Sequence, residues 1–257
     1  MRQVGNGVLL CGGAAAVVSN ECFLLSFGVW LRYPIVSPMN ENRQYAASAL
    51  LGGSWWITGG INGQYVLSTT EIRSTRGTWS RSTSLPRSLG GHCMVTINDT
   101  HVFLSGGSNG VIGSVFGTTY LYSIKSGWQK RDDMLTDRYR HACALRGDDK
   151  STIVVSGGSV DGDKFLSSTE FFRVDSGKWE SGPALPSATY DAQMISVNGH
   201  TYHIGGFATK KDVFRLDQDS SGTWKWTDVG SLYVNRYAFD IVPIPSMEEC
   251  EKWEGNK

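Results

Sequence analysis

Histidines and cysteines are the residues of this chain best suited to bind a metal or to act in catalysis, and there are five of each. The closest two histidines, His200 and His203, are three residues apart on an expected strand, so their side chains point to opposite faces and do not converge. The cysteine spacings match neither a metal cage nor a disulfide-dense scaffold. No Gly-rich phosphate loop, nucleophile elbow or paired-carboxylate motif occurs. The sequence therefore predicts no metal, no cofactor and no enzymatic activity.

A second set of polar and aromatic residues recurs just before one strand in each repeat of the chain. Arginine and tyrosine are favoured at interfaces because each combines a large contact area with hydrogen bonding. Several arginines around one mouth would suit a protein partner or an acidic peptide. The alternative is that one arginine per repeat belongs to the framework, which makes Arg140, Tyr190 and Asp191 the better candidates. The predicted partner-binding residues are Arg43, Tyr45, Arg87, His92, Arg138, Arg140, His141, Tyr190, Asp191, Arg236 and Tyr237.

An internal repeat sets the elements that must position these residues. A Gly-Gly pair recurs five times at a nearly constant interval, and a tryptophan follows each pair at a similar distance. Short apolar runs between turn signals predict four strands per repeat and no long helix. We expect each tryptophan to be buried between adjacent sheets, close to a glycine pair. The glycines are Gly12, Gly13, Gly59, Gly60, Gly106, Gly107, Gly157, Gly158, Gly205 and Gly206, and the tryptophans are Trp30, Trp79, Trp128, Trp179 and Trp224.

The glycine pairs and tryptophans, with Glu21, Glu71 and Glu170 opening the strand after each loop, resemble kelch repeats. The resemblance implies an all-β propeller, here of five four-stranded blades. We expect closure by the C-terminal strand 237–242, which would join the N-terminal blade beside residues 8–13. The alternative is a six-bladed parent that lacks one blade.

The same resemblance implies a non-catalytic protein–protein interaction scaffold that binds at the loop face of the ring. The alternative is a carbohydrate-binding or carbohydrate-active propeller that uses the central pocket. Loops on a rigid scaffold commonly carry recognition. The loops after the glycine pairs therefore form a second candidate surface, with Asn62, Gln64, Asn109, Asp161, Asp163, Lys164, Lys210 and Lys211.

Composition and charge limit the partners. Basic and acidic residues both number 24, so the formal charge is zero and there is no basic excess of the kind that nucleic-acid binders show. No 18-residue apolar stretch predicts a membrane span. We assign residues 1–245 to the propeller and 246–257 to a flexible tail. The oligomeric state is left open.

Cys11 and Cys22 fall on strands that should be antiparallel neighbours, so we expect them to lie within bridging reach. A disulfide and a pair of buried thiols are both compatible with this placement. Cys93 and Cys143 are offset by one residue in equivalent strands and are expected to be free thiols pointing to opposite faces. Asn98-Asp99-Thr100 is a glycosylation sequon at a predicted hairpin tip. The Cys11–Cys22 pair and the sequon favour an extracellular location, with a cytoplasmic one as the alternative.

Overall fold

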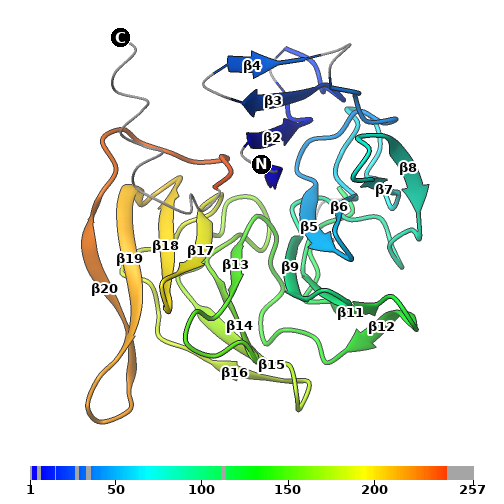
Figure 1. The fold of residues 1–257 in the computed structure, drawn as a ribbon. Coiled ribbons are helices and arrows are strands. Elements are labelled where there is room, and N and C mark those ends of the chain that lie inside the picture. Colours follow the sequence, from blue (N-terminus) through cyan, green and yellow to red (C-terminus); the bar gives the residue numbers. More distant parts are fainter. Residues whose placement is uncertain are drawn as a thin grey trace.

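The computed structural model describes residues 2–4, 7–14, 16–26, 29–32, 36–110 and 114–241. Its strands form five four-stranded antiparallel sheets, which are arranged as blades around a common centre (Figure 1). This confirms the predicted propeller of five blades. Blade 1 holds β1 (Arg2–Val4), β2 (Gly7–Cys11), β3 (Cys22–Ser26) and β4 (Val29–Leu31), and blade 2 holds β5 (Ala47–Leu51), β6 (Ser54–Thr58), β7 (Thr70–Arg73) and β8 (Trp79–Ser82).

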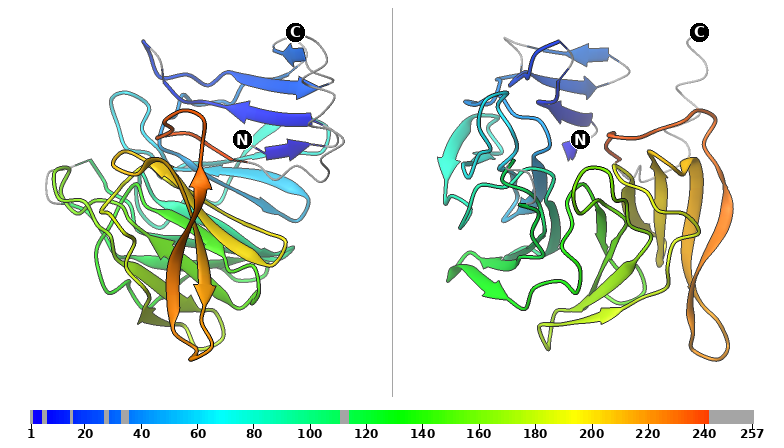
Figure 2. Two further views of the ribbon diagram at one scale, coloured as in Figure 1. Left: turned by 90° about the vertical axis from the view of Figure 1, so that its left-hand side faces the viewer. Right: turned by 180° about the vertical axis from the view of Figure 1, so that it is seen from behind.

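The other three blades repeat this order, with the first strand innermost. Figure 2 shows that the long β19–β20 hairpin projects from blade 5. The blades consist of β9 (Cys93–Asn98), β10 (His101–Ser105), β11 (Thr119–Ser123) and β12 (Gly127–Arg131); of β13 (Ala142–Leu145), β14 (Thr152–Ser156), β15 (Thr169–Arg173) and β16 (Lys178–Ser181); and of β17 (Gln193–Val197), β18 (His200–Gly206), β19 (Lys210–Gln218) and β20 (Trp224–Ser231).

Apolar cores lie between neighbouring blades, which explains why the second strands are continuous apolar runs. In β10, Val102 and Leu104 face blade 2, whereas Phe103 faces blade 4, and all three are fully buried. Both faces of such a strand need apolar side chains, so the alternation expected of a half-buried strand is lost. Four such cores join blades 1 to 5 in sequence, and none in the described part of the chain joins blade 5 to blade 1.

The innermost strand of blade 1 differs from expectation. β1 pairs with β2 in the register Gln3↔Val8, and it occupies the place predicted for residues 237–242. Residues 237–241 form no strand, and Val242 lies outside the described residues, as does the predicted tail 246–257. Closure by the C-terminal strand is therefore wrong for this structure. A tight hairpin between β1 and β2 costs far less chain entropy than a pairing between the two ends of the chain.

The tryptophans are less buried than predicted, because they lie on the outer strands. Trp79, Trp128 and Trp179 are half-buried, each packed against the core shared with the preceding blade. Trp79 and Trp179 donate hydrogen bonds from Nε1 to the carbonyls of Ser37 and Asp132, at 3.0 and 2.9 Å, in the loop that leads into their own blade. Trp30 of blade 1 is 49% exposed, as expected for the blade that has no core on that side.

The glycine pairs contact the chain that crosses to the next blade and not the tryptophans. A Cβ on Gly157 would lie 2.7 Å from the carbonyl oxygen of Thr189, closer than real Cβ atoms come. The second glycine of each pair has a positive φ and donates its N–H to that same carbonyl, as Gly158 does to Thr189 at 2.8 Å. The pair therefore holds each crossover loop, the segment that leads from the outer strand of one blade to the inner strand of the next.

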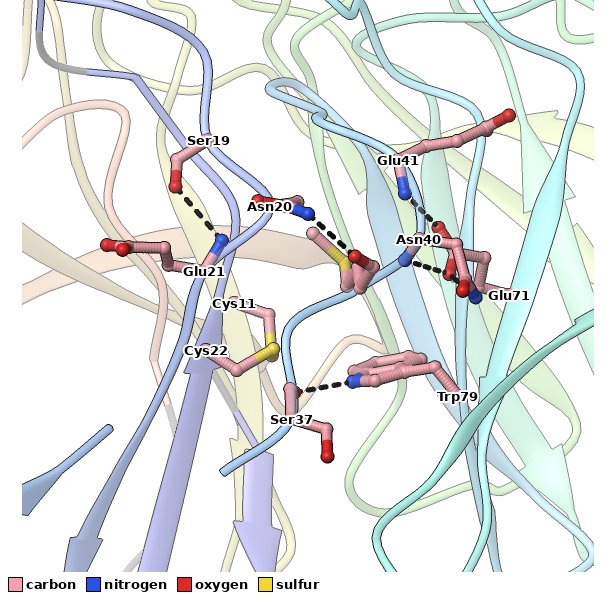
Figure 3. The surroundings of a disulfide bond; sticks show 11 residues. Cys11, Ser19, Asn20, Glu21, Cys22, Ser37, Asn40, Glu41, Glu71 and Trp79 are labelled. Atoms are coloured by element: carbon pink, nitrogen blue, oxygen red, sulfur yellow. Dashed lines mark hydrogen bonds between the residues drawn. A yellow bond between two sulfur atoms is a disulfide. The ribbon is translucent and has the colours of Figure 1, made fainter. Parts of the chain in front are cut away.

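The predicted proximity of Cys11 and Cys22 is confirmed, and of the two alternatives the structure has the disulfide (Figure 3); the two residues are directly paired in β2 and β3, with Cα atoms 4.1 Å apart. The expectation that Cys93 and Cys143 are free is wrong, since they form a disulfide between β9 and β13. Neighbouring blades face each other, so a side chain on one face of β9 meets one on the opposite face of β13. The one-residue offset is thus what brings the two sulfurs together.

Removing the Cys93–Cys143 disulfide should lower the free energy of unfolding by about 2–4 kcal/mol, because it closes a loop of sequence separation 50 between two blades. The measurement is urea unfolding of the oxidised protein and of the variant C93S/C143S. The matched control is C11S/C22S, whose loop of separation 11 restrains the unfolded chain less and should cost less. A Cys93–Cys143 variant as stable as the oxidised wild type would contradict the assignment.

Candidate functional site: the mouth of the central channel

The four crossover loops, and the segment that follows β20, meet at one mouth of the central channel through one residue each. These residues share a left-handed backbone, with φ between 50° and 66°, and each lines the channel. Their backbones are bonded in series from blade to blade, with N···O distances of 2.6 to 3.0 Å, each N–H donating to the carbonyl of the residue before it in the series. A left-handed conformation is unusual for residues other than glycine, asparagine and aspartate. We call this set the rim residues: Tyr45, Gly91, Arg140, Asp191 and Ala238.

Two of the predicted binding arginines are framework residues. Arg43 and Arg138 are 1% and 0% exposed. Arg43 donates to the carbonyl of Gly59 at 2.6 Å and pairs with Glu71 at 2.9 Å; Arg138 repeats this with Gly157 and Glu170. Their guanidinium groups are enclosed within their own blades and cannot contact a partner. Burial lowers the pKa of Arg138, and Glu170 opposes that shift.

The two glutamates in turn hold the crossover loops. The carboxylate of Glu71 accepts the backbone N–H groups of Asn40 and Glu41 at 2.6 and 3.0 Å (Figure 3). Glu170 accepts those of Leu135 and Thr136 at 2.7 and 3.0 Å. Each Arg–Glu pair therefore fixes a crossover loop to the hairpin between the second and third strands of the same blade.

The strand registers show that the buried arginine and its glutamate either occur together in a blade or are both absent from it. In blade 3 the positions of Arg138 and Glu170 are taken by Leu89 and Tyr120, and in blade 5 by Thr189 and Phe214. Blades 3 and 5 also have a proline, Pro86 and Pro186, at the position equivalent to Leu135, which in blade 4 donates its N–H to Glu170. Proline has no N–H, so no carboxylate is needed there. In blade 1 the register Cys11↔Cys22 puts Phe23 at this position, so Glu21 is not the equivalent residue.

Two further predicted arginines have other environments. Arg87 lies two residues before the position equivalent to Arg43, and its guanidinium carbon stacks 3.4 Å from the ring centroid of Phe116. Arg236 is exposed, and its carbonyl accepts the N–H of Gly206. The expectation of a strongly positive mouth is thus wrong for Arg43 and Arg138, because buried carboxylates neutralise them.

The two predicted histidines, His92 and His141, are buried beneath the rim, and so is His203, which was not predicted to bind. His92 and His141 are hydrogen bonded through Nε2 to Thr58 Oγ1 and Ser105 Oγ at 2.9 and 3.0 Å, and His203 contacts Ser156 Oγ at 2.9 Å. Burial, then the charge of Arg43, lowers the pKa of His92 to about 3, and burial lowers that of His203 to about 3. Burial also lowers the pKa of His141 well below its ordinary value, with Arg138 and His92 adding to the effect.

These hydroxyl–imidazole pairs resemble part of a catalytic triad, but they are enclosed. Thr58, Ser105 and Ser156 are 0% exposed, and the second ring nitrogen of each histidine has no hydrogen-bond partner. A nucleophile must reach its substrate, and its base needs an orienting group. The enclosed hydroxyls and unoriented imidazoles meet neither requirement. We therefore assign these pairs the role of joining neighbouring blades. In the described residues no group of three or more histidine, cysteine or acidic side chains could hold a metal ion.

Arg140 is the one predicted arginine that is organised at the rim. Its Nε donates to Asp191 Oδ1 at 2.7 Å, and Nη2 bonds the other carboxylate oxygen. The guanidinium carbon lies 5.0 Å from the ring centroid of Tyr45 and 4.5 Å from that of Tyr190. Burial alone would lower the pKa of Arg140, but the hydrogen bonds and charge of Asp191 raise it above its ordinary value. The ion pair therefore holds two tyrosines beside a permanent cation.

An arc of aromatic side chains continues from Tyr190 along the mouth. Tyr190 stacks on Phe207 with ring centroids 5.0 Å apart, and Phe165 and Tyr237 lie 4.6 Å from Tyr190 and 5.6 Å from Phe207, respectively. Phe207 is 46% exposed, Tyr237 55% and Tyr45 41%. Phe165 and Phe207 were not predicted from the sequence. The available signal was an aromatic residue directly after a glycine pair, at Phe207.

The loops after the glycine pairs share this face with the crossover loops, so the two predicted surfaces are one. A pocket of about 260 Å³ is lined by both kinds of loop, including Tyr45, Ile61, Arg140 and Asp161. It opens beside the channel, whose volume is about 820 Å³. Lys210 and Lys211 do not belong to a loop, because they begin β19.

Other members of this second surface shape their own turns. Asn62 accepts the N–H groups of Gln64 and Tyr65 at 3.0 and 2.7 Å, and Asp161 accepts those of Asp163 and Lys164. Such side-chain caps fix a loop without outside contacts. These polar side chains therefore hold their own loops in shape. The aromatic arc is the surface that remains for a partner on this face.

Comparisons with known proteins agree with the fold. A scan against models of protein families gives no match. The chain is 27% identical to Kelch-like protein 41b of Danio rerio over 152 residues, 59% of this chain and 24% of that protein. It is 26% identical to Kelch-like protein 40 of Xenopus tropicalis, over 69% of this chain and 25% of that protein. This chain thus spans about a quarter of the length of these curated relatives.

A solved structure, that of YjhT, superposes with a TM-score of 0.73 at 12% identity. The superposition covers 87% of this chain and 82% of that one, and at this identity it bears on the fold alone. Among the residues that the structure describes, no helix is long and apolar enough to span a membrane.

Proposed function

Because the chain is a kelch-repeat β-propeller, we propose that it is a protein-interaction scaffold whose partner binds at the mouth formed by the crossover loops. The observation that carries this proposal is the aromatic arc of Phe165, Tyr190, Phe207 and Tyr237, of which Phe207 and Tyr237 are exposed. Tyr45, which is also exposed, lies across Arg140. Exposed aromatic residues next to an ordered arginine are typical of the centres of protein interfaces.

Aromatic contact, and not bulk positive charge, supports the choice of partner. Arg43 and Arg138 are enclosed, and Arg140 is paired with Asp191, which leaves Arg236 as the exposed arginine of the predicted set that an acidic peptide could contact. The partner we propose is a protein segment with apolar or aromatic side chains. These would cover Phe207 and Tyr237, while a backbone carbonyl accepts from Arg140.

A binding function is also favoured over catalysis at the mouth. The three histidines near the channel stay neutral at physiological pH and are enclosed. The one charged pair at the rim satisfies itself. The rim therefore combines fixed shape with exposed ring surface, which suits recognition.

The test is affinity capture followed by mass spectrometry, with the wild type, F207A/Y237A, and a control variant, I124A. Ile124 is 56% exposed and lies after β11, at the end of the blade away from the mouth. We expect the affinity of F207A/Y237A for the partner to fall at least about tenfold, since truncating a central interface aromatic costs about 2 kcal/mol or more. The control should retain it. A partner that the mouth variant captures as well as the wild type would contradict the proposal.

A further inference from the structure

The turn between β9 and β10 exposes the chain's one Asn-X-Ser/Thr sequence, Asn98-Asp99-Thr100. All three residues are exposed, and Asn98 has a φ of 50°, which asparagine tolerates better than most residues. An acceptor asparagine must leave the protein surface to enter a transferase, so an exposed hairpin tip is a suitable place for it. The structure thus gives the motif the setting that its chemistry needs.

The side chains of this turn are arranged so that one end of the Asn98 carboxamide is held. Its Oδ1 accepts hydrogen bonds from the backbone N and from Oγ1 of Thr100, both at 2.9 Å. In the described residues no hydrogen bond of Asn98 Nδ2 is found. The nitrogen that would carry a sugar is therefore the free end of the group.

Exposed apolar side chains flank the turn. Leu50 is 47% exposed and Ile124 56%. Both lie near the motif. The backbone of Leu50 is hydrogen bonded to Oγ1 of Thr96, two residues before Asn98, at 2.9 and 3.0 Å, and Ile124 N bonds the carbonyl of Thr100 at 3.1 Å. A sugar chain on Asn98 would cover this apolar surface, which otherwise faces water.

The position of the turn is compatible with the proposed function. β9 begins at the mouth with Cys93 and ends at Asn98, so the turn is on the face opposite the rim residues. Two disulfides, Cys11–Cys22 and Cys93–Cys143, are of the kind that form in an oxidising compartment, where N-linked sugars are also attached. Disulfides and an exposed acceptor are independent features, and both point to the same route.

We propose that Asn98 is an N-linked glycosylation site whose sugar chain covers the Leu50–Ile124 surface of the propeller. The co-reactant is an oligosaccharide carried on a lipid diphosphate. A bond forms between Asn98 Nδ2 and the anomeric carbon of the oligosaccharide, the bond from that carbon to the phosphate oxygen breaks, and Nδ2 loses one proton. The lipid diphosphate is the leaving group.

The test is expression in eukaryotic cells behind a secretory leader, with the mobility of the protein compared before and after peptide-N-glycosidase. The wild type and T100S, which keeps the hydroxyl, should both shift. N98Q and T100A should run at the mobility of the deglycosylated wild type. Mass spectrometry of the tryptic peptide should place the modification on Asn98.

The assay is run on the microsomal fraction as well as on the medium, so that poor secretion of a variant does not hide the result. Wild-type protein that carries both disulfides and an unoccupied Asn98 would overturn the proposal, as would a shift that persists in N98Q. Because the site is opposite the mouth, glycosylated and deglycosylated protein should capture the same partner. Failure of that capture would bear on the proposed function and not on the glycosylation site.

Discussion

R138L is expected to lower the free energy of unfolding by about 3–5 kcal/mol, because it leaves the carboxylate of Glu170 buried without its cation. Arg138 is 0% exposed, and it also donates to the carbonyls of Gly157 and Ser168 at 2.8 and 3.1 Å. All of these acceptors lose a donor in the variant. The loss is therefore far larger than the loss of one surface contact.

The double variant R138L/E170Y should recover much of that loss, since it removes the buried charge along with its partner. Blade 3 already has this combination, with Leu89 and Tyr120 at the equivalent positions. Recovery should be incomplete, because the N–H groups of Leu135 and Thr136 lose their acceptor. Adding L135P, which copies Pro86 of blade 3, removes one of those donors and should recover more.

A double-mutant cycle in urea measures the coupling between the two side chains. The control is K130M, because Lys130 and Asp133 form an exposed pair 3.1 Å apart, which should be worth at most about 1 kcal/mol. Single-variant costs that simply add in R138L/E170Y would show that the pair does not act as a unit. A cost for R138L as small as that of K130M would contradict the assignment of Arg138 to the framework.

The repeat allowed the fold to be predicted, because it records features that every blade must have. Glycine pairs, outer-strand tryptophans and short apolar runs specify four strands and a close crossover five times over. The proximity of Cys11 and Cys22 was also predictable, since both residues belong to one hairpin and local register decides their distance. Such features depend on short-range geometry, which the sequence expresses directly.

The parts that could not be predicted depend on which blade a side chain faces. The one-residue offset between Cys93 and Cys143 places them on opposite faces of equivalent strands, but the two side chains meet because the sheets of neighbouring blades face each other. Arg43 and Arg138 are of a residue type that interfaces favour. Their role is decided by Glu71 and Glu170, which lie on the third strands of their blades. Register between the second and third strands had to be known before those partners could be assigned.

Acidification below about pH 6.5 is expected to destabilise the propeller steeply through three histidines. His92, His141 and His203 are 6%, 7% and 0% exposed, and burial lowers the pKa of each, to about 3 for His92 and His203. In the unfolded chain each has a pKa of about 6.5. Because the folded pKa is the lower one, the unfolded state binds more protons between these values, and stability falls as the pH falls.

The slope of the free energy of unfolding against pH distinguishes the effect of these histidines from that of the acidic groups. Three extra protons correspond to about 4 kcal/mol per pH unit once the unfolded histidines are fully protonated, whereas above about pH 7 the contribution is flat. Carboxylates with a lowered pKa, such as that of Asp149 at about 2, contribute only at more acidic pH. The interval from pH 7 to 4.5 therefore reports on the histidines. A typical domain stability of about 5–15 kcal/mol would be lost within a few pH units.

Urea unfolding at half-unit steps from pH 7.5 to 4.5 checks this expectation for the wild type, H203Q and H200Q. Glutamine at position 203 can still bond Ser156 but does not titrate, so the slope should become shallower by about 1.4 kcal/mol per pH unit whatever the variant costs at pH 7.5. His200 is exposed at the start of β18, so H200Q serves as the control that replaces a histidine outside the buried set. Stability that stays level from pH 7 to 5, or a slope unchanged in H203Q, would show that these imidazoles accept protons in the folded protein.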